Sequence, residues 1–208
     1  MSFDRLRTNG TGLTPPCLPR MLEDSALSPY FPAMALLEIL EVPDPRLRQV
    51  STPVEEVNDE TRALIADMFE TMYAAPGIGL AAVQVGVPRR LLVIDLQEPE
   101  EEDGEPVRDP RVFINPEILT HSDQEVPYTE GCLSVPDQYA EVDRPDRIRA
   151  RWLDEQGARH EEDIDGMLAV CLQHEMDHLE GVLFIDHLSR LKREMILRKI
   201  AKARKQAA

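Results

Sequence analysis

The chain has 208 residues, the usual length of a single domain. Hydrophobic residues make up 42% of the sequence, which is enough to build a core, and no apolar run is long enough to cross a bilayer. The formal net charge of -16 opposes general binding to nucleic acid. We therefore expect a globular protein without membrane contact and without specific affinity for DNA.

Residues 1–33 differ in composition from the rest of the chain. They contain five prolines, several Gly, Ser and Thr residues, and no hydrophobic periodicity. The prolines interrupt any signal-peptide core, and acidic residues balance the arginines, unlike an organelle transit peptide. We predict that 1–33 is a disordered extension or the product of an upstream start codon, that 34–208 forms the folded domain, and that the protein is cytoplasmic.

The first predicted elements are a strand at Leu37–Val42, a helix at Asn58–Tyr73 and a strand at Arg90–Asp95. Between the last two lies Gly77–Gly86, which is small and apolar apart from Gln84. Small residues allow a substrate to approach the backbone, and an amide can donate to a developing oxyanion. Without further motifs, however, we prefer the interpretation of Gln84 as an ordinary polar residue at the end of a strand over that of an oxyanion donor.

The middle of the chain is predicted to be rich in strands. Glu98–Asp109 is an acidic stretch with Pro and Gly, typical of a solvated loop or hairpin tip. Strands are expected at Val112–Leu119, Tyr139–Val142 and Arg147–Leu153, the last with alternating apolar residues. With helices before and after, this order predicts an α+β fold.

Cys132 lies in a short segment, Glu130–Pro136, that we interpret as an ordered loop or bulge. A thiolate is a strong ligand for zinc or ferrous iron. A lone cysteine is more often a small buried hydrophobic residue. This interpretation suits Cys171, which lies on the predicted apolar helix. Cys17 lies in the irregular N-terminal segment, where no function is required of it. The three cysteines show no paired spacing, which argues against a disulfide framework.

The strongest motif is HExxH, formed by His174, Glu175 and His178. A helix is predicted over Met167–Leu179, with Asp165 as its N-cap and a glycine beyond its end. Residues four apart share one helix face, so both histidines can reach one metal ion, and Glu175 can serve as the base for a hydrolytic water. Two buried core histidines would be the alternative, but this motif on a helix favours metal-assisted hydrolysis.

A catalytic metal site usually has three protein ligands. Phe184 occupies the position where metzincins carry a third histidine. Glu194, the candidate for a downstream glutamate, lies in a basic amphipathic segment. Cys132 is therefore the better third ligand.

The C-terminal segment is basic, whereas the chain as a whole is acidic. Eight lysines and arginines between Arg190 and Lys205 face one acid, Glu194. An apolar stripe predicts an amphipathic helix; it consists of Leu191, Met195, Ile196 and Ile200. The basic residues can be a solvated face that offsets the helix dipole, but their number exceeds that need.

Three ordered motifs, Gly77–Gln84, Glu130–Ser134 and Gln173–Gly181, resemble those of the peptide deformylase family, in its bacterial form with a C-terminal helix. The resemblance covers roughly Met34 to the C-terminus and implies a catalytic domain at 34–208. The resemblance fits a fold in which mainly antiparallel sheets surround a buried metal-binding helix. It also implies that the enzyme removes the formyl group from the N-terminal formyl-methionine of new proteins and releases formate.

The resemblance implies that Cys132, His174 and His178 hold one Fe2+ ion per chain, which zinc, nickel or cobalt can replace. Glu175 would move the proton of the attacking water. The Gln84 amide and the Leu133 backbone N–H would face the formyl oxygen. The backbone around Gly79 and Gly131 would pair with the extended substrate.

The family pattern further implies that Glu130 pairs with Arg144, although the residues alone favour two solvated charges. It implies that the C-terminal helix docks at the ribosome near the exit tunnel. Two other functions stay open: a metallopeptidase that cleaves ordinary peptide bonds, and an inactive ribosome-associated module.

Overall fold

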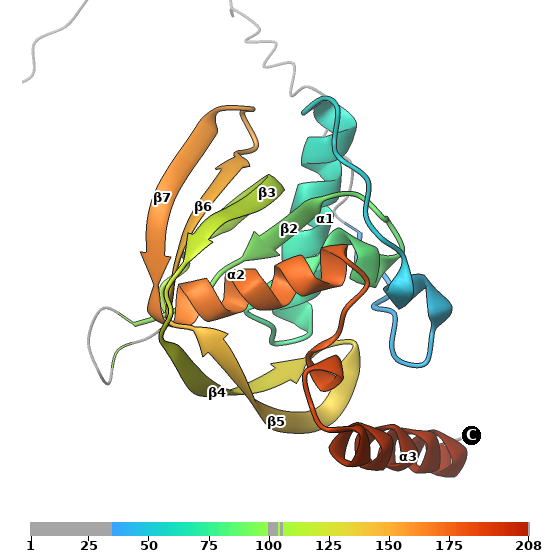
Figure 1. The fold of residues 1–208 in the computed structure, drawn as a ribbon. Helices are drawn as coiled ribbons and strands as arrows, with labels where there is room; N and C mark the ends of the chain where they lie inside the picture. The colour runs from blue at the N-terminus through green and yellow to red at the C-terminus, as the bar shows by residue number, and fades with distance from the viewer. Residues whose placement is uncertain (1–34, 100–103, 105, 208) are drawn as a thin grey trace, which may run out of the picture. The chain divides into compact units, whose positions relative to one another are not determined.

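The computed structural model describes residues 35–99, 104 and 106–207. These belong to a unit that spans Pro32–Ala208, distinct from a unit at Met1–Phe31. The predicted extension at 1–33 therefore lies outside the described residues, and so does Cys17. The predicted fold class is confirmed, because the described unit combines helices with antiparallel sheets and ends in a long helix (Figure 1).

Seven strands form two antiparallel sheets within the described residues. One has five strands in the order β1-β2-β3-β6-β7, and the other is the β4–β5 hairpin. The strands are β1 (Gly79–Ala81), β2 (Leu91–Ile94), β3 (Arg111–His121), β4 (Glu125–Cys132), β5 (Val135–Pro145), β6 (Arg147–Leu153) and β7 (Arg159–Asp165). The helices are α1 (Asp59–Ala74), α2 (Gly166–Leu179) and α3 (Arg190–Ala207), with short 3-10 helices η1 (Pro45–Arg48), η2 (Ala82–Val85) and η3 (Phe184–Asp186).

The five-stranded sheet is covered by α2 on one face and by α1 on the other. In β2, Leu92 and Ile94 belong to the core cluster that contains α2 side chains, whereas Leu91 and Val93 pack with those of α1. A strand buried on both faces reads as a continuous apolar run, which is what Leu91–Ile94 shows. The sheet therefore holds α2 in the centre of the unit, with the β4–β5 hairpin on its other side (Figure 1).

Three strands were not predicted: the short β1, and the longer β4 and β7. In β7 only Ile164 is buried, and the acidic side chains around it give no strand pattern. They are held by the neighbouring strand instead: Arg149 lies 3.1 Å from Glu161 and 2.9 Å from Asp163. Strand β4 contains Pro127 and ends at Gly131 and Cys132, where we expected only a loop or bulge. Long-range pairing, which no local pattern reveals, makes both segments strands.

The predicted strand at Leu37–Val42 is wrong. Its segment has no regular secondary structure, ends in a turn at Val42 and joins no sheet. Leu40 N donates to Gln84 O at 2.7 Å, and Val42 N donates to Ser134 O at 2.9 Å. Gln84 lies in the connection between β1 and β2, and Ser134 lies in the turn between β4 and β5. The segment is therefore hydrogen-bonded to two connections and not to one strand.

The bounds of α2 are close to the prediction. Asp165 is the N-cap residue, as predicted, and its side chain makes no capping hydrogen bond. Gly181 lies just past the helix with φ +71°, and its N–H donates to His178 O at 3.1 Å. An added Cβ there would be 2.6 Å from the carbonyl oxygen of Arg48. Gly181 thus ends the helix as predicted and also allows a close backbone contact.

Candidate metal centre and active site

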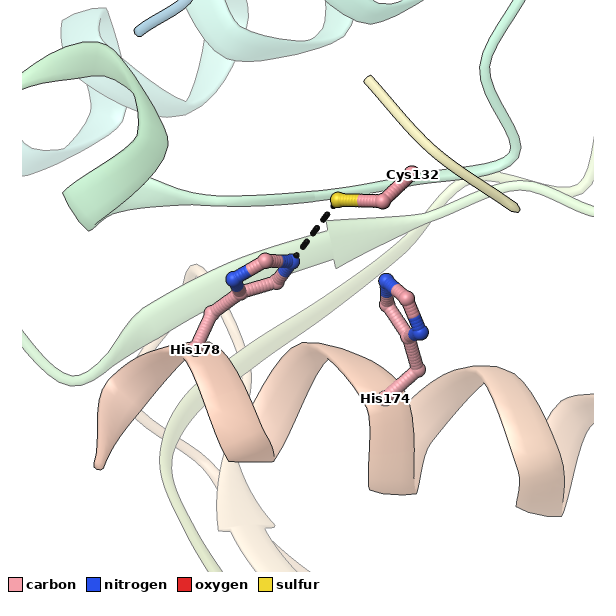
Figure 2. A group of neighbouring side chains, drawn as sticks. All are labelled: Cys132, His174 and His178. Atoms are coloured by element: carbon pink, nitrogen blue, oxygen red, sulfur yellow. Dashed lines mark hydrogen bonds between the residues drawn. The ribbon is translucent and has the colours of Figure 1, made fainter. Parts of the chain in front are cut away.

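The three predicted ligands meet between α2 and the end of β4. His174 and His178 lie one turn apart on α2, and Cys132 lies where the β4–β5 pairing shifts register. One ligand atom from each residue lies within 4.8 Å of the others, and Cys132 Sγ is 3.2 Å from His178 Nε2 (Figure 2). This register shift at the end of β4 agrees with the loop or bulge expected at Glu130–Pro136.

The chemistry of these donors fits a divalent transition metal. Burial lowers the pKa of His178 well below its usual value, which keeps the imidazole neutral and its lone pair available. Burial also lowers the pKa of His174, but hydrogen bonds with Cys132 and Glu130 outweigh it and raise that pKa. The site thus brings together one sulfur and two imidazoles, the donors that zinc and ferrous iron accept.

Glu130 and Arg144 form a buried ion pair, so the interpretation as two solvated charges is wrong. Arg144 Nε lies 2.6 Å from Glu130 Oε1, and Nη2 lies 3.0 Å from Oε2. Glu130 Oε2 also lies 2.7 Å from His174 Nδ1. Burial raises the pKa of Glu130, but hydrogen bonds from His174 and Arg144 prevail and bring it to about 2. This fixed carboxylate sets the orientation of the His174 ring.

Glu175 lies beside the three ligand residues and is 4% exposed. Its Oε2 has no hydrogen-bond partner among the described residues. Burial raises the pKa of Glu175 to about 7. An added Cβ on Gly79 would lie 2.5 Å from Oε1, so only glycine leaves room for this carboxylate. Glu175 is therefore suited to take up and release a proton near neutral pH.

Gln84 and Leu133 lie on the strand side of the centre. Gln84 is in η2 rather than at the end of a strand, and its Oε1 accepts from Ala81 N at 2.7 Å. This contact fixes the amide so that Nε2 faces Ser134 Oγ at 3.1 Å and Cys132 Sγ at 3.6 Å. Leu133 lies in the turn between β4 and β5.

A groove of about 290 Å³ runs past the centre. Gly79 and Gly131 both line it, together with Leu133, His174 and Glu175. The two glycines belong to β1 and β4, and within the described part of the chain each of these strands pairs with a single neighbour. Each can therefore offer the backbone groups of its other edge to an extended peptide.

The sequence prediction missed several groove residues. Met167, Val170 and Cys171 line the groove from α2. Met167 and Cys171 precede Glu175 by eight and four positions, which is the spacing of one helix face, and this signal could have identified them. Tyr128 and Tyr139 line it from the hairpin, and only the pairing of β4 with β5 brings them there.

The two residues rejected as ligands have other contacts. Phe184 stacks on His174 with ring centroids 6.2 Å apart. Glu194 pairs with Arg190 on α3 at 2.9 Å. Both positions agree with the choice of Cys132 as the third ligand.

Comparison with known proteins gives one consistent result. Residues 36–194 match the family model described as polypeptide deformylase. The peptide deformylase of Rhizorhabdus wittichii is 72% identical over 172 residues, covering 83% of this chain and 97% of the relative. That of Novosphingobium aromaticivorans is 63% identical, covering 84% of this chain and all of the relative.

Solved structures agree. A crystal structure of a peptide deformylase from Legionella pneumophila has a TM-score of 0.75 at 44% identity and covers 83% of this chain and 98% of its own. A peptide deformylase from Ehrlichia chaffeensis, solved in complex with actinonin, has a TM-score of 0.76 at 46% identity and covers 82% of this chain and 98% of its own.

Proposed function

The chain belongs to the peptide deformylase family, and from this premise we propose that Cys132, His174 and His178 hold one Fe2+ ion that zinc, nickel or cobalt can replace. The family is one of metalloenzymes, and this protein removes the formyl group from the N-terminal methionine of newly synthesised proteins, releasing formate. A bound divalent metal would polarise the reacting water and the formyl oxygen, as it does in other amide hydrolases.

Three further groups act on the reacting atoms in our proposal. Glu175 accepts the proton of the attacking water at its unpartnered Oε2 and later gives it to the leaving amine. The Gln84 Nε2 and the Leu133 backbone N–H donate to the oxygen on which negative charge develops. The fixed orientation of the Gln84 amide supports this role, because a donor held in place before the reaction costs no reorganisation.

We propose that the substrate backbone lies as an extra strand between the free edges of β1 and β4, alongside Gly79 and Gly131. Leu133, Val170 and Cys171 give the groove an apolar wall, which suits a methionine side chain. The bound formyl-methionyl end would then present its formyl group to Glu175 and Gln84.

The observation that carries this proposal is the meeting of one thiol and two imidazoles beside a buried carboxylate with no partner. Formate release from formyl-Met-Ala-Ser tests it, with the same peptide lacking the formyl group as control. We expect formate from the first peptide and no cleavage of the second. Cleavage of the unformylated peptide would favour the metallopeptidase alternative, and inertness toward both would favour the non-enzymatic one.

We also propose that α3 binds the ribosome near the exit tunnel, where the substrate emerges. Ile196 and Ile200 of α3 are buried in the core cluster that includes Leu40 and Val142. The lysines of this helix are exposed, so the charge can meet RNA phosphates while the helix stays packed. The proposed location is the cytoplasm. Among the described residues, none of the helices has the length and apolarity to cross a membrane.

A further inference from the structure

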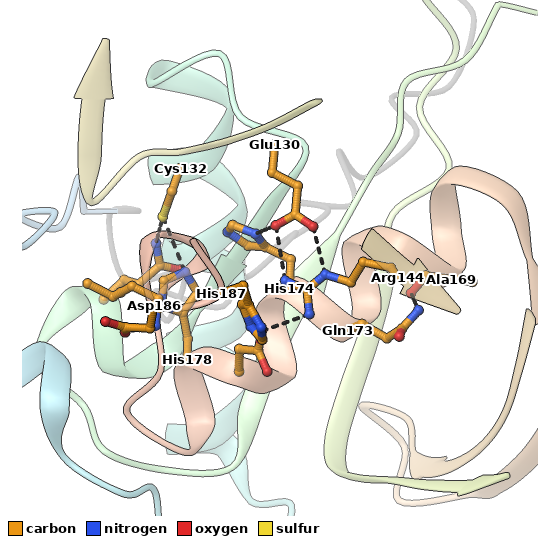
Figure 3. A network of polar contacts seen from close by, with 12 residues as sticks. Glu130, Cys132, Arg144, Ala169, Gln173, His174, His178, Asp186 and His187 are labelled. Carbon is orange, nitrogen blue, oxygen red and sulfur yellow. Dashed lines mark hydrogen bonds and ion pairs between the residues drawn. The ribbon is translucent and has the colours of Figure 1, made fainter. Parts of the chain in front are cut away.

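A chain of polar contacts leads from the surface to the metal centre. His187 lies immediately after η3, and its Nε2 is 2.7 Å from Asp177 Oδ2. The same carboxylate oxygen accepts from Arg144 Nη1 at 2.7 Å. Arg144 also donates hydrogen bonds to both carboxylate oxygens of Glu130, and Glu130 is hydrogen-bonded to His174 (Figure 3). One unbroken path thus joins an exposed imidazole to the ring of a proposed metal ligand.

We propose that Asp177 and His187 are positioning residues for His174, acting through Arg144 and Glu130; this inference rests on the proposed metal centre. Arg144 places its three donor groups on two carboxylates. Asp177 therefore fixes one side of the guanidinium while Glu130 is held by the other. His187 donates an N–H to Asp177 and restrains that carboxylate from turning toward solvent.

The solvent exposure of His187 and Asp177 distinguishes a role in orienting His174 from a role in the stability of the fold. The His187 side chain is 39% exposed and that of Asp177 is 24% exposed, whereas Arg144 and Glu130 are buried. An exposed pair adds little to the free energy of folding. Loss of the His187 donor should therefore leave the melting temperature almost unchanged, yet let Arg144 and Glu130 relax and loosen the His174 ring.

The test uses cobalt(II)-loaded protein and follows loss of the cobalt absorption in excess EDTA. His187→Phe keeps a ring but removes the donor, and His187→Gln keeps a donor. His160→Phe is the matched control, because His160 Nε2 also lies 2.7 Å from an aspartate, Asp154, and its side chain is 37% exposed, but it stacks on Trp152 away from the centre.

We expect His187→Phe to release cobalt about three- to tenfold faster than the native protein, below the 10- to 100-fold typical of residues bonded directly to a ligand. His187→Gln should return to within about twofold of the native rate, and His160→Phe should match the native protein. Asp177→Asn combined with His187→Phe should release cobalt no faster than Asp177→Asn alone, because both changes act through one path.

Three results would overturn the inference. They are a native release rate for His187→Phe, equal release by the Phe and Gln variants, and multiplication of the two effects in the double variant. Failure of the native protein to bind cobalt would instead refute the proposed metal centre itself, and the inference with it.

Discussion

Gly79→Ala tests the placement of Glu175 more directly than removal of the carboxylate does. The new Cβ would lie 2.5 Å from Glu175 Oε1, whereas ordinary contacts begin at 3.4 Å. The carboxylate must therefore retreat by about 0.9 Å, the difference of these two distances, in surroundings that leave it 4% exposed. A misplacement of about 1 Å can cost about 100-fold in rate, so we expect kcat to fall by roughly that factor.

The assay is formate release from formyl-Met-Ala-Ser, with metal content and melting temperature measured on the same samples. Overpacking should cost about 1–3 kcal/mol of folding free energy, which lowers the melting temperature by several degrees. Gly77→Ala is the comparison variant: its Cβ would lie 2.8 Å from Leu133 Cδ1, so it disturbs the apolar wall of the groove, which should raise KM, while none of its near contacts is with Glu175. It should show a similar thermal loss with a much smaller change in kcat.

The reasoning is refuted if Gly79→Ala keeps near-native kcat with its metal retained, because Glu175 would then not need its present position. Equal losses of kcat in both alanine variants would also contradict it, since the effect would then follow from strain in the β1 region alone.

Three other predictions concern the centre and α3. Glu175→Gln should retain metal and lose most turnover, because an amide cannot accept the proton; normal turnover with full metal content would remove it from the mechanism. Cys132→Ser should bind metal more weakly, as titration with cobalt would show, because a hydroxyl is a poor ligand at neutral pH; unchanged affinity would mean that the ligand set is misassigned. Replacing Lys192, Lys199 and Lys202 by Glu should weaken ribosome co-sedimentation at low salt and leave turnover of a short formyl peptide unchanged; unaltered co-sedimentation would speak against docking through α3. Charge reversal is preferable to truncation, because truncation would remove buried isoleucines of α3.

The sequence predicted features that depend on local spacing. The HExxH helix, its terminating glycine and the alternation in Arg147–Leu153 were all confirmed, because each follows from the period of one element. The pairing of Glu130 with Arg144 came from family resemblance alone. Their fourteen-residue separation carries no local signal, and the two side chains meet only because β4 and β5 form a hairpin.

Features that depend on distant contacts could not be read from the residues. The acidic side chains of strand β7 pair with the arginines of β6, and Leu37–Val42 joins no sheet because it bonds to two separate connections. The path from His187 to Arg144 is of the same kind, since it joins α2, the hairpin and the connection before α3. Such contacts require knowledge of which elements become neighbours, and periodicity does not supply it.

The candidate metal centre joins two short motifs, one on β4 and one on α2. Glu130 and Cys132 are two positions apart on β4, and they contact His174 and His178, which are four apart on α2. Four helix residues rise about 6 Å, and Cys132 reaches His178 from beyond the register shift that separates it from Gly131. One strand can therefore supply a ligand to the metal and a carboxylate to the other ligand's ring at the same time. The candidate centre therefore combines a motif on the strand with a motif on the helix, and the fold brings the two motifs together.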